Sequence, residues 1–353
     1  MNPEASTRYA IIGCGVIGPA HADAVIRCPQ AELVAVCDLI PERARQCAEQ
    51  YGGKPYQDYT ELLASERPDA ISVCTPHHNH AEIACRGLEG GVDVLCEKPL
   101  AISREQMALM IETARRNRRT LGGVFQHRFD PVTATLKEAV DAGLFGETLN
   151  AGASIRCFRG EGYYSSAPWR GTWDGEGGAV LINQAIHSID VLQWFAGPVQ
   201  TVFGRCANLR LNGCIETEDT ACAALQFRSG ALGSIEATSS SHLDFEGGVH
   251  FYGTQGSFRI TTGGRDDLEY VQLRDEDAAR ELEAMLEKAR EVPRADAVGK
   301  DCYGDSHARL IEDFVAATRN GREPRVTGES ARHAVEIVLA VYESHRTGMP
   351  VTL

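Results

Sequence analysis

The chain has 353 residues, a formal net charge of −14 and 43% hydrophobic residues, which is the composition of a globular protein long enough for two domains. The acidic charge argues against binding nucleic acid or anionic membrane surfaces, and no apolar run approaches the roughly twenty residues that span a bilayer. No signal peptide is recognisable and the twelve cysteines form no C-x-x-C pair, so we expect a cytoplasmic protein with reduced thiols and no zinc site.

The first predicted element is a short buried strand over residues 9–12, which a glycine-rich loop connects to a helix over residues 19–27. The loop has the spacing G-x-G-x-x-G. Its first glycine allows a tight turn, its second lets a pyrophosphate approach the backbone, and its third lets the helix pack on the strand. The free N–H groups at the start of the helix favour phosphate. A turn that binds nothing is the alternative. The loop residues expected to contact a dinucleotide are Gly13, Gly15, Val16, Ile17 and Gly18.

A second predicted strand, residues 33–37, ends in Asp38, about twenty residues beyond the glycine loop, where such folds place an acid on the ribose hydroxyls. Because a carboxylate repels a 2′-phosphate, Asp38 favours NAD over NADP. Arg43 and Arg45 follow closely and leave NADP open. The alternative for Asp38 is a capping acid for the helix that begins at Pro41.

Three further strands, over residues 70–74, 92–96 and 121–125, alternate with predicted helices, which indicates an α/β fold with a doubly wound parallel sheet. Ligands bind beyond the carboxyl ends of such strands, and polar residues follow each strand of this chain. The helices are expected over residues 41–51, 58–64, 81–89 and 103–117. The strand-end residues expected to contact the cofactor are Asp38, Thr75, Pro76, His77, Asn79, His80, Glu97, Lys98, Gln126 and Arg128.

Two of these strand ends suggest specific chemistry. Residues 77–80 contain three histidines, but no carboxylate or cysteine completes a ligand set, so we expect no metal there. We assign Asn79 or His80 to capping the next helix. Lys98 lies between a carboxylate and a proline, and its ammonium can polarise a carbonyl or hold an alcohol oxygen. A solvated surface lysine is the alternative.

After residue 130 the alternation stops, and a helix over residues 131–142 leads into a β-rich region. We therefore divide the chain into a Rossmann dinucleotide-binding domain, residues 1–130, and an α+β domain for substrate binding and oligomerisation, residues 131–353. The second domain is expected to have a large, mainly antiparallel, open-faced sheet. An uncovered sheet face is a natural subunit interface, so we expect a homodimer or homotetramer. The strands are expected over residues 148–158, 199–209, 219–227, 231–239, 249–252, 257–262 and 268–273.

A helix predicted over residues 182–195 carries three polar residues in an apolar segment. Asn183 and His187 are four residues apart and so lie on one helix face, with Asp190 three residues further on. Such polar groups need partners. A buried histidine satisfied by its neighbours is as compatible with this helix as a catalytic one.

Together these motifs resemble the Gfo/Idh/MocA family, the group of glucose–fructose oxidoreductase and inositol dehydrogenase. The resemblance covers nearly the whole chain. It implies the two-domain architecture and an enzyme that uses NAD or NADP to transfer a hydride to or from a secondary alcohol of a sugar, inositol or related polyol. It rests on the glycine loop, Thr75-Pro76 with His80, Glu97-Lys98-Pro99, Trp169-Arg170, Gly177-Gly178…His187-x-x-Asp190 and the closing pattern Glu329…Glu336…Tyr342-Glu343-Ser344…Gly348…Val351.

The resemblance also assigns roles to residues. It implies that Lys98 and His187 form the catalytic pair, that Asn183 lines the substrate site, and that Trp169 and Arg170 belong to the site. We count both among the cofactor-binding residues. Many members have aspartate at the position of Asn183, and an amide cannot take up a proton as a carboxylate does. The sequence therefore leaves undecided which group would take up the proton from His187.

Aromatic rings suit the faces of sugars, and an arginine can capture a carboxylate such as that of a uronate. The residues expected to bind substrate are Asn183, Arg156, Tyr163, Trp169 and His307. Two other functions stay open: a glycosidase that uses bound NAD as a transient oxidant, and a non-catalytic NAD-binding regulator. The presence of both Lys98 and His187 argues against the regulator, which needs only the nucleotide half.

Overall fold

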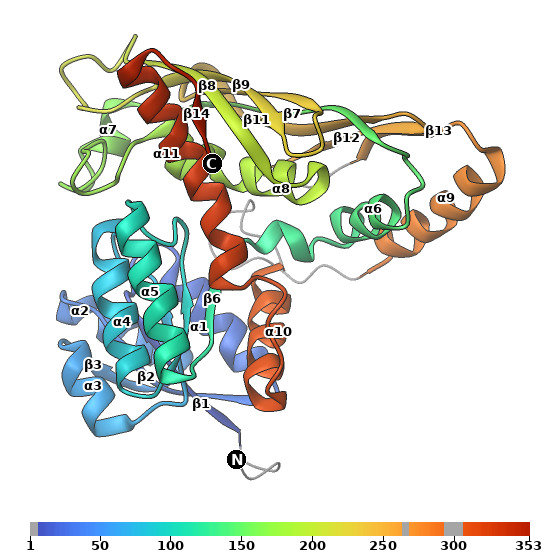
Figure 1. The fold of residues 1–353 in the computed structure, drawn as a ribbon. Coiled ribbons are helices and arrows are strands. Elements are labelled where there is room, and N and C mark those ends of the chain that lie inside the picture. The colour runs from blue at the N-terminus through green and yellow to red at the C-terminus, as the bar shows by residue number, and fades with distance from the viewer. Residues whose placement is uncertain (1–5, 263–267, 293–305) are drawn as a thin grey trace. The chain divides into compact units, whose positions relative to one another are not determined.

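The computed structural model describes residues 6–262, 268–292 and 306–353, and the chain divides into two compact units. The first unit runs to Gln126 and takes in a later segment that ends at Arg332, while the second runs from His127 and includes His333–Leu353. Figure 1 shows the strands and helices of both units. The sequence-based boundary at residue 130 places helix α10 (Ser306–Asn320) in the second domain. The helix instead packs against α1 (Gly18–Arg27) in the first unit, where its apolar face is buried.

The first unit is built on a six-stranded parallel sheet, which confirms the predicted doubly wound fold. The strands are β1 (Thr7–Ile12), β2 (Ala31–Cys37), β3 (Lys54–Tyr56), β4 (Ala70–Val73), β5 (Asp93–Cys96) and β6 (Leu121–Gly123), in the order β3-β2-β1-β4-β5-β6. Ile11, Ile71 and Val94 are fully buried, as expected for strands covered on both faces. Strand β3 was missed because it has only three residues, one of them proline. The remaining elements are α2 (Pro41–Tyr51), α3 (Tyr59–Glu66), the 3₁₀ turn η1 (His77–Asn79), α4 (His80–Glu89) and α5 (Arg104–Asn117).

The second unit is built on an eight-stranded mixed sheet. Its strands are β7 (Thr148–Phe158), β8 (Val199–Ala207), β9 (Thr220–Phe227), β10 (Leu232–Thr238), β11 (Ser240–Gly253), β12 (Gly256–Thr261), β13 (Leu268–Leu273) and β14 (Val351–Thr352), in the order β13-β12-β11-β7-β10-β9-β8-β14. β7 and β10 pair in parallel and the other neighbours are antiparallel. The helical elements are η2 (Gln126–Phe129), α6 (Pro131–Asp141), α7 (Glu161–Tyr164), η3 (Val180–Ala185), α8 (Ile186–Ala196), α9 (Glu276–Arg290) and α11 (Gly328–Thr347), whose first residues belong to the first unit.

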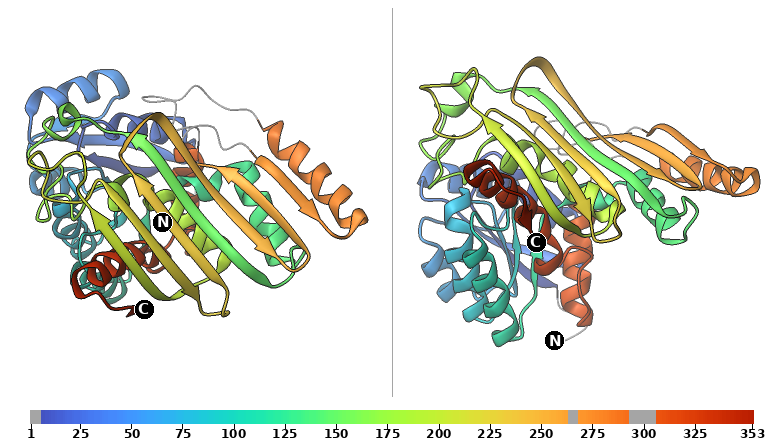
Figure 2. Two further views of the ribbon diagram at one scale, coloured as in Figure 1. Left: turned by 90° about the horizontal axis from the view of Figure 1, so that it is seen from above. Right: turned by 45° about the horizontal axis from the view of Figure 1, so that its top comes forward.

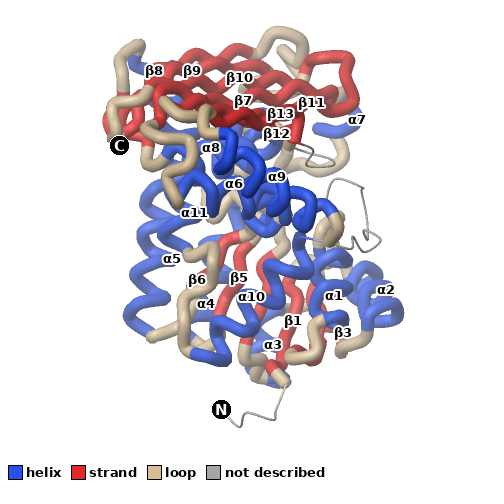
Figure 3. The backbone as a smooth tube through the Cα atoms, turned by 90° about the vertical axis from the view of Figure 1, so that its right-hand side faces the viewer, coloured by secondary structure: helices blue, strands red, loops and turns tan. Residues whose placement is uncertain are grey.

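One face of the second sheet is covered and the other is open, as predicted. Along β9, Ala221, Ala223 and Leu225 are buried, whereas Cys222 and Ala224 are exposed. Helix α8 packs on the buried face against β7 and β11, on the side where Figure 3 shows it. The left view of Figure 2 looks onto the strands from the other side, over which none of the described helices is drawn. The use of this open face as a subunit interface stays a prediction.

The helix predicted over residues 182–195 is interrupted near its start. A π-helical turn, η3, precedes α8. A π turn holds more residues than an α turn, so the regular four-residue spacing assumed for Asn183 and His187 is broken between them. The buried carboxylate of Glu218 accepts the N–H groups of Ala179 and Leu181 at the start of the turn. This partner lies about forty residues away, which is why local periodicity could not predict the turn.

Within the described residues, no helix combines the length and the apolar character needed to cross a membrane. The described cysteines are free thiols, and most are buried in the two cores.

Candidate functional site

The glycine loop between β1 and α1 leaves room for a ligand at its second glycine. Gly13 has a φ of +104°, and a Cβ there would lie 2.4 Å from the carbonyl oxygen of Cys74, so a side chain cannot be accommodated. A Cβ on Gly15 would meet no atom within 4 Å. The N-cap residue of α1, Ile17, makes no side-chain capping bond. The loop therefore fits the pyrophosphate of a dinucleotide.

Asp38 follows β2 and is fixed by backbone groups on two sides. One carboxylate oxygen accepts the N–H of Cys14 within the glycine loop at 2.9 Å, and the other accepts the N–H of Ile40 at 2.8 Å. A carboxylate has about four acceptor positions, so these two bonds leave capacity for ribose hydroxyls. This geometry fits the predicted role of Asp38.

Lys98 follows β5 in a loop that is held on both of its sides. The buried carboxylate of Glu97 accepts the N–H of Lys98 at 2.9 Å. On the other side, Nδ1 of His80 lies 2.8 Å from the carbonyl oxygen of Pro99, and its Nε2 lies 2.9 Å from that of Thr75. His80 therefore connects the loops that follow β4 and β5, while the Lys98 side chain is half-buried.

The histidines that follow β4 have different surroundings. His77 and His80 are buried, whereas His78 is exposed. Asn79 occupies the N-cap position of α4 without a side-chain capping bond, and the ring of His80 contacts carbonyl oxygens elsewhere. The predicted capping role of Asn79 or His80 is therefore wrong. The predicted contacts of these residues with cofactor stay predictions.

A different cluster gathers under Lys98 in the first unit. His21 of α1, Glu97 and His307 of α10 are all buried, and the atoms through which they could bind an ion lie within 4.8 Å of one another. Nε2 of His21 is 3.0 Å from Oε1 of Glu97, and Nε2 of His307 is 3.8 Å from the same oxygen. His21 was not predicted as a site residue. His307 was predicted to bind substrate, and the structure places it against Glu97.

In the second unit, Arg128 pairs with Asp190 of α8. Its Nε and Nη2 lie 2.8 and 2.5 Å from the two carboxylate oxygens, and both side chains are buried. Such a bidentate pair fixes the position of α8 relative to η2. The guanidinium predicted to contact cofactor thus has a carboxylate partner within its own unit.

His187 of α8 lies beside a second histidine that the sequence analysis missed. The ring of His127 meets the ring of His187 edge-on, with centroids 5.3 Å apart. Nδ1 of His127 is 2.7 Å from Oδ2 of Asp130. A carboxylate therefore orients His127, and His127 packs against the predicted catalytic imidazole.

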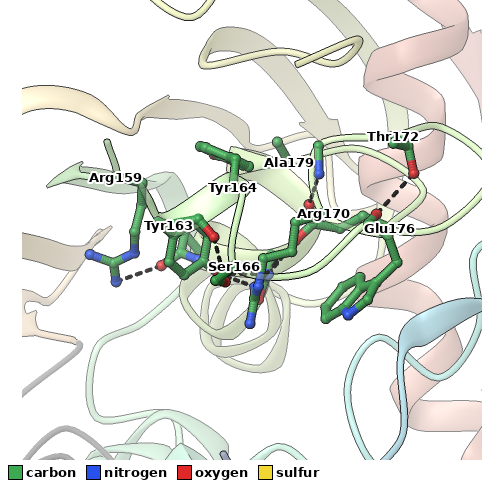
Figure 4. A network of polar contacts seen from close by, with 12 residues as sticks. Arg159, Tyr163, Tyr164, Ser166, Arg170, Thr172, Glu176 and Ala179 are labelled. Atoms are coloured by element: carbon green, nitrogen blue, oxygen red, sulfur yellow. Dashed lines mark hydrogen bonds and ion pairs between the residues drawn. The ribbon is translucent and has the colours of Figure 1, made fainter. Parts of the chain in front are cut away.

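The predicted substrate residues Tyr163 and Asn183 meet in a polar network, shown in part in Figure 4. The hydroxyl oxygen of Tyr163 lies 2.5 Å from Nη1 of Arg170 and 3.2 Å from the amide nitrogens of Asn183 and Gln184. The guanidinium carbons of Arg159 and Arg170 lie 5.4 and 4.3 Å from the centre of its ring. Burial raises the pKa of Tyr163, so this hydroxyl stays neutral and accepts from its neighbours.

Asn183 also donates to Glu176, a fully buried carboxylate. The same carboxylate accepts the N–H of Gly171 at 2.5 Å and lies 3.9 Å from Nη1 of Arg170. The asparagine that stands where many family members have aspartate is thus hydrogen-bonded to an acid. Glu176 was not predicted, and its only local signal is an acid between two glycines. Trp169 joins the same region, since the guanidinium carbon of Arg170 lies 4.6 Å from the centre of its ring system.

A second buried acid, Glu218, accepts hydrogen bonds from backbone N–H groups at the start of η3. A Cβ on Gly178, whose φ is +140°, would lie 2.1 Å from the hydroxyl of Tyr342, and that hydroxyl donates to Glu218 at 2.8 Å. The acid also accepts the N–H of Leu181 at 3.0 Å. Burial raises the pKa of Glu218 to about 7. The absence of a side chain at Gly178 therefore lets Tyr342 and Glu218 pack against the segment that carries Asn183.

Arg156 lies outside this network. It extends from β7 between the buried residues Ile155 and Cys157, so it points away from the face that α8 covers. Its guanidinium pairs with Glu236 at 2.9 Å and with Glu246 at 3.2 Å. The structure therefore does not bring Arg156 together with the other predicted substrate residues.

The family can now be assigned. Residues 7–124 match the model of the oxidoreductase family with the NAD-binding Rossmann fold, and residues 137–353 match the C-terminal alpha/beta domain of the same family, GFO_IDH_MocA. The chain belongs to the Gfo/Idh/MocA oxidoreductase family, as its motifs predicted, and its N-terminal domain is an NAD-binding Rossmann domain.

Three similar proteins narrow the activity. The chain is 27% identical to scyllo-inositol 2-dehydrogenase (NAD(+)) of Bacillus subtilis (strain 168), over 99% of this chain and 97% of that protein. It is 29% identical to D-glucoside 3-dehydrogenase of Escherichia coli (strain K12), over 98% and 97%. The crystal structure of the WlbA dehydrogenase from Bordetella pertussis with NADH and UDP-GlcNAcA superposes with a TM-score of 0.88 at 28% identity, over 99% and 98%. The chain is thus an NAD(P)-dependent dehydrogenase of the class that acts on the CH–OH groups of sugars or polyols.

Proposed function

We propose that the enzyme oxidises a secondary ring alcohol of a sugar, an inositol or a related cyclic polyol, with NAD as hydride acceptor and Lys98 and His187 as the catalytic pair. The observation that carries the proposal is the placement of Lys98, at the carboxyl end of β5 and with both neighbouring residues tied down. The similar proteins support the substrate class, since their names describe oxidation of an inositol and a glucoside.

NAD is favoured over NADP because of Asp38. Backbone N–H groups hold its carboxylate on both oxygens next to the glycine loop, and a fixed negative charge there disfavours a 2′-phosphate. We expect Asp38→Ser to lower the ratio of kcat/KM for NAD to that for NADP by on the order of tenfold, through loss of the ribose contact and of the repulsion.

Lys98 and His187 would have different roles, one toward the alcohol oxygen of the substrate and the other toward its hydroxyl proton. Bound NAD supplies the hydride acceptor. The Lys98 ammonium donates to the alcohol oxygen and stabilises negative charge that develops there. The His187 imidazole accepts the hydroxyl proton near neutral pH. His127, held by Asp130, keeps the His187 ring oriented through the edge-on contact.

The network around Tyr163 would face the substrate. The amide nitrogen of Asn183 donates to Glu176 and Tyr163, which fixes the side chain in place, and an amide can hydrogen-bond a substrate hydroxyl. The aromatic ring of Trp169 suits a sugar face. Arg159 and Arg170 flank Tyr163, and their positive charge favours substrates that carry a carboxylate, such as uronates.

The test is an activity screen with purified full-length protein. NAD or NADP is combined with inositols, glucosides, free uronates and a nucleotide-linked uronate, and reduced nicotinamide is followed by absorbance. On the best substrate, Lys98→Ala and His187→Ala should each lower kcat by about a hundredfold or more. The matched controls Lys54→Ala and His242→Ala remove exposed residues of the same types in the same two units and should leave kcat within about twofold.

Two results would contradict the proposal. Full turnover in Lys98→Ala would remove the lysine from the catalytic pair. Release of free sugar from a glycoside without net accumulation of reduced nicotinamide would show a glycosidase instead of a dehydrogenase.

A further inference from the structure

The loop that carries Lys98 rests on a chain of buried polar contacts. Nε2 of His21 lies 3.0 Å from the carboxyl group of Glu97, which accepts the N–H of Lys98. Nδ1 of His21 lies 2.9 Å from the Ser72 hydroxyl, which lies 2.9 Å from the hydroxyl of Tyr9. Neutral His21 satisfies this chain if Nε2 donates to Glu97 and Nδ1 accepts from Ser72. Burial lowers the pKa of His21 and so favours this neutral form.

Two more histidines contact the same loop from other helices. His307, the second residue of α10, places Nε2 3.8 Å from Oε1 of Glu97. His80, the first residue of α4, places Nδ1 2.8 Å from the carbonyl oxygen of Pro99. Three histidines from α1, α4 and α10 therefore contact the residues immediately before and after Lys98.

Stability alone gives little reason for such a cluster. Replacing buried ionic groups by apolar residues of similar volume is often neutral or stabilising. A hydrogen-bonded cluster does fix orientation, because each bond is strong only over a limited range of distances and angles. In this chain the oriented groups are the backbone N–H of Lys98 and the carbonyl of Pro99. A displacement of about 1 Å in a catalytic group can cost a hundredfold in rate.

We propose that His21, His80 and His307 are positioning residues for Lys98. They hold Glu97 and Pro99, and these two residues fix the direction in which the lysine side chain leaves the loop. The proposal rests on the proposed function only for what Lys98 does to the substrate. The positioning itself can be measured on the lysine without any substrate.

The first experiment measures how fast the amine of Lys98 reacts with trinitrobenzenesulfonate in the full-length protein with saturating NAD, by mass spectrometry of its peptide. In His80→Gln and His307→Gln, the loosened loop should expose the amine, and modification should be about threefold faster or more. Lys54 and Lys288, which are exposed, are internal references whose rates should not change. His78→Gln removes an exposed histidine from the same segment and is the matched control variant.

The graded series at one position separates positioning from general loss of structure. His80→Gln keeps an N–H that can reach a carbonyl, so it should react more slowly than His80→Ala. His307→Gln should retain wild-type NAD affinity within about twofold, because His307 is not among the residues expected to contact the cofactor. If His80→Gln does not fold, His307→Gln carries the test, since its contact with Glu97 is the longer one. Wild-type reactivity of Lys98 in all folded variants would overturn the proposal.

With a substrate in hand, the same variants should lower kcat by about tenfold and change KM by less than about threefold. A loss confined to KM would overturn positioning of a catalytic group. Full activity in Lys98→Ala would instead refute the proposed function and leave the labelling result standing. One tightly bound divalent ion per chain, lost in Glu97→Gln, would also overturn the proposal, because the two histidines near Glu97 would then be metal ligands.

Discussion

Glu97 in the first unit and Glu218 in the second are both buried and hydrogen-bonded, yet their pKa values move in opposite directions. Burial raises the pKa of either group. For Glu97, the hydrogen bond with His21 and the nearby imidazole of His307 outweigh burial and hold the pKa well below its usual range. For Glu218, burial outweighs the bonds from the N–H of Leu181 and a tyrosine hydroxyl, and the pKa rises to about 7.

The difference lies in the partners, because the two acids are buried to a similar degree, 6% and 3% exposed. Glu97 contacts two imidazole nitrogens, at 3.0 and 3.8 Å, in addition to the N–H of Lys98, whereas the donors to Glu218 are backbone amides and one phenol. The acid beneath Lys98 is therefore a fixed charge. The acid beneath the segment that carries Asn183 changes its charge near neutral pH.

The largest difference is expected when each acid becomes an amide at pH 7. Glu97→Gln should lower the free energy of unfolding by about 3 kcal/mol, because an amide has only one acceptor oxygen, so its NH2 group would face either the His21 imidazole or the N–H of Lys98. Glu218→Gln should leave it unchanged or raise it by about 1 kcal/mol, because burial already penalises the charged form of Glu218 at this pH. Urea denaturation measures both, with the exposed Glu32→Gln as control. A larger loss for Glu218→Gln would contradict the comparison.

The pKa directions also predict opposite pH dependences. Folded Glu218 binds its proton more tightly than the unfolded chain does, so its contribution to stability is full below its ordinary pKa of 4.5 and is lost as the pH rises toward 7. Relative to Glu218→Gln, the wild type should therefore lose up to about 3 kcal/mol over this window. Folded Glu97 binds its proton less tightly, so its contribution is present above its ordinary pKa and is lost as the pH falls.

The measurement is the difference in unfolding free energy between wild type and each variant over a range of pH. The difference for Glu218→Gln should shift in favour of the variant as the pH rises. The penalty of Glu97→Gln should shrink as the pH falls through and below its ordinary pKa. Parallel curves for the two variants would show that their partners do not decide the charge.

The parts of the site that the sequence predicted are those whose geometry is set within a few residues. A side chain at Gly13 would collide with the backbone of Cys74, and the absence of one at Gly15 leaves space for a ligand. The spacing of the glycine motif is enough to predict both features. Asp38 and Lys98 directly follow strands, and the parallel sheet brings such strand ends to one edge. The alternation of strands and helices was enough to predict that sheet.

The parts that could not be predicted depend on contacts between distant segments. Glu218 supports residues about forty positions earlier, and His307 contacts Glu97 across more than two hundred residues. No periodicity within a helix reports such partners, which is why the packing of α10 on α1 could not be predicted. Arg156 was predicted to bind substrate because the sequence does not show which face of the sheet its side chain occupies. That face follows from the pairing of β7 with β10 and β11.

The smallest effect, and the most specific, is expected at the network around Tyr163. Asn183→Asp would place a second carboxylate against the buried Glu176, so repulsion should raise the pKa of the pair. If the pKa of the pair is higher in the folded variant than in its unfolded chain, the free energy of unfolding is retained at low pH and falls as the pH rises. The variant should therefore match wild type near pH 5 and lose about 1 kcal/mol near pH 8.

Gln184→Glu is the matched control, because its side-chain oxygen accepts from Nη2 of Arg159 at 2.8 Å. Its new carboxylate meets a guanidinium, so its stability should not fall as the pH rises. Thermal unfolding of both variants at the two pH values gives the comparison. If Asn183→Asp showed no pH-dependent loss, Glu176 would have to be neutral, and the amide at position 183 could not be explained as a neutral partner for a buried charge.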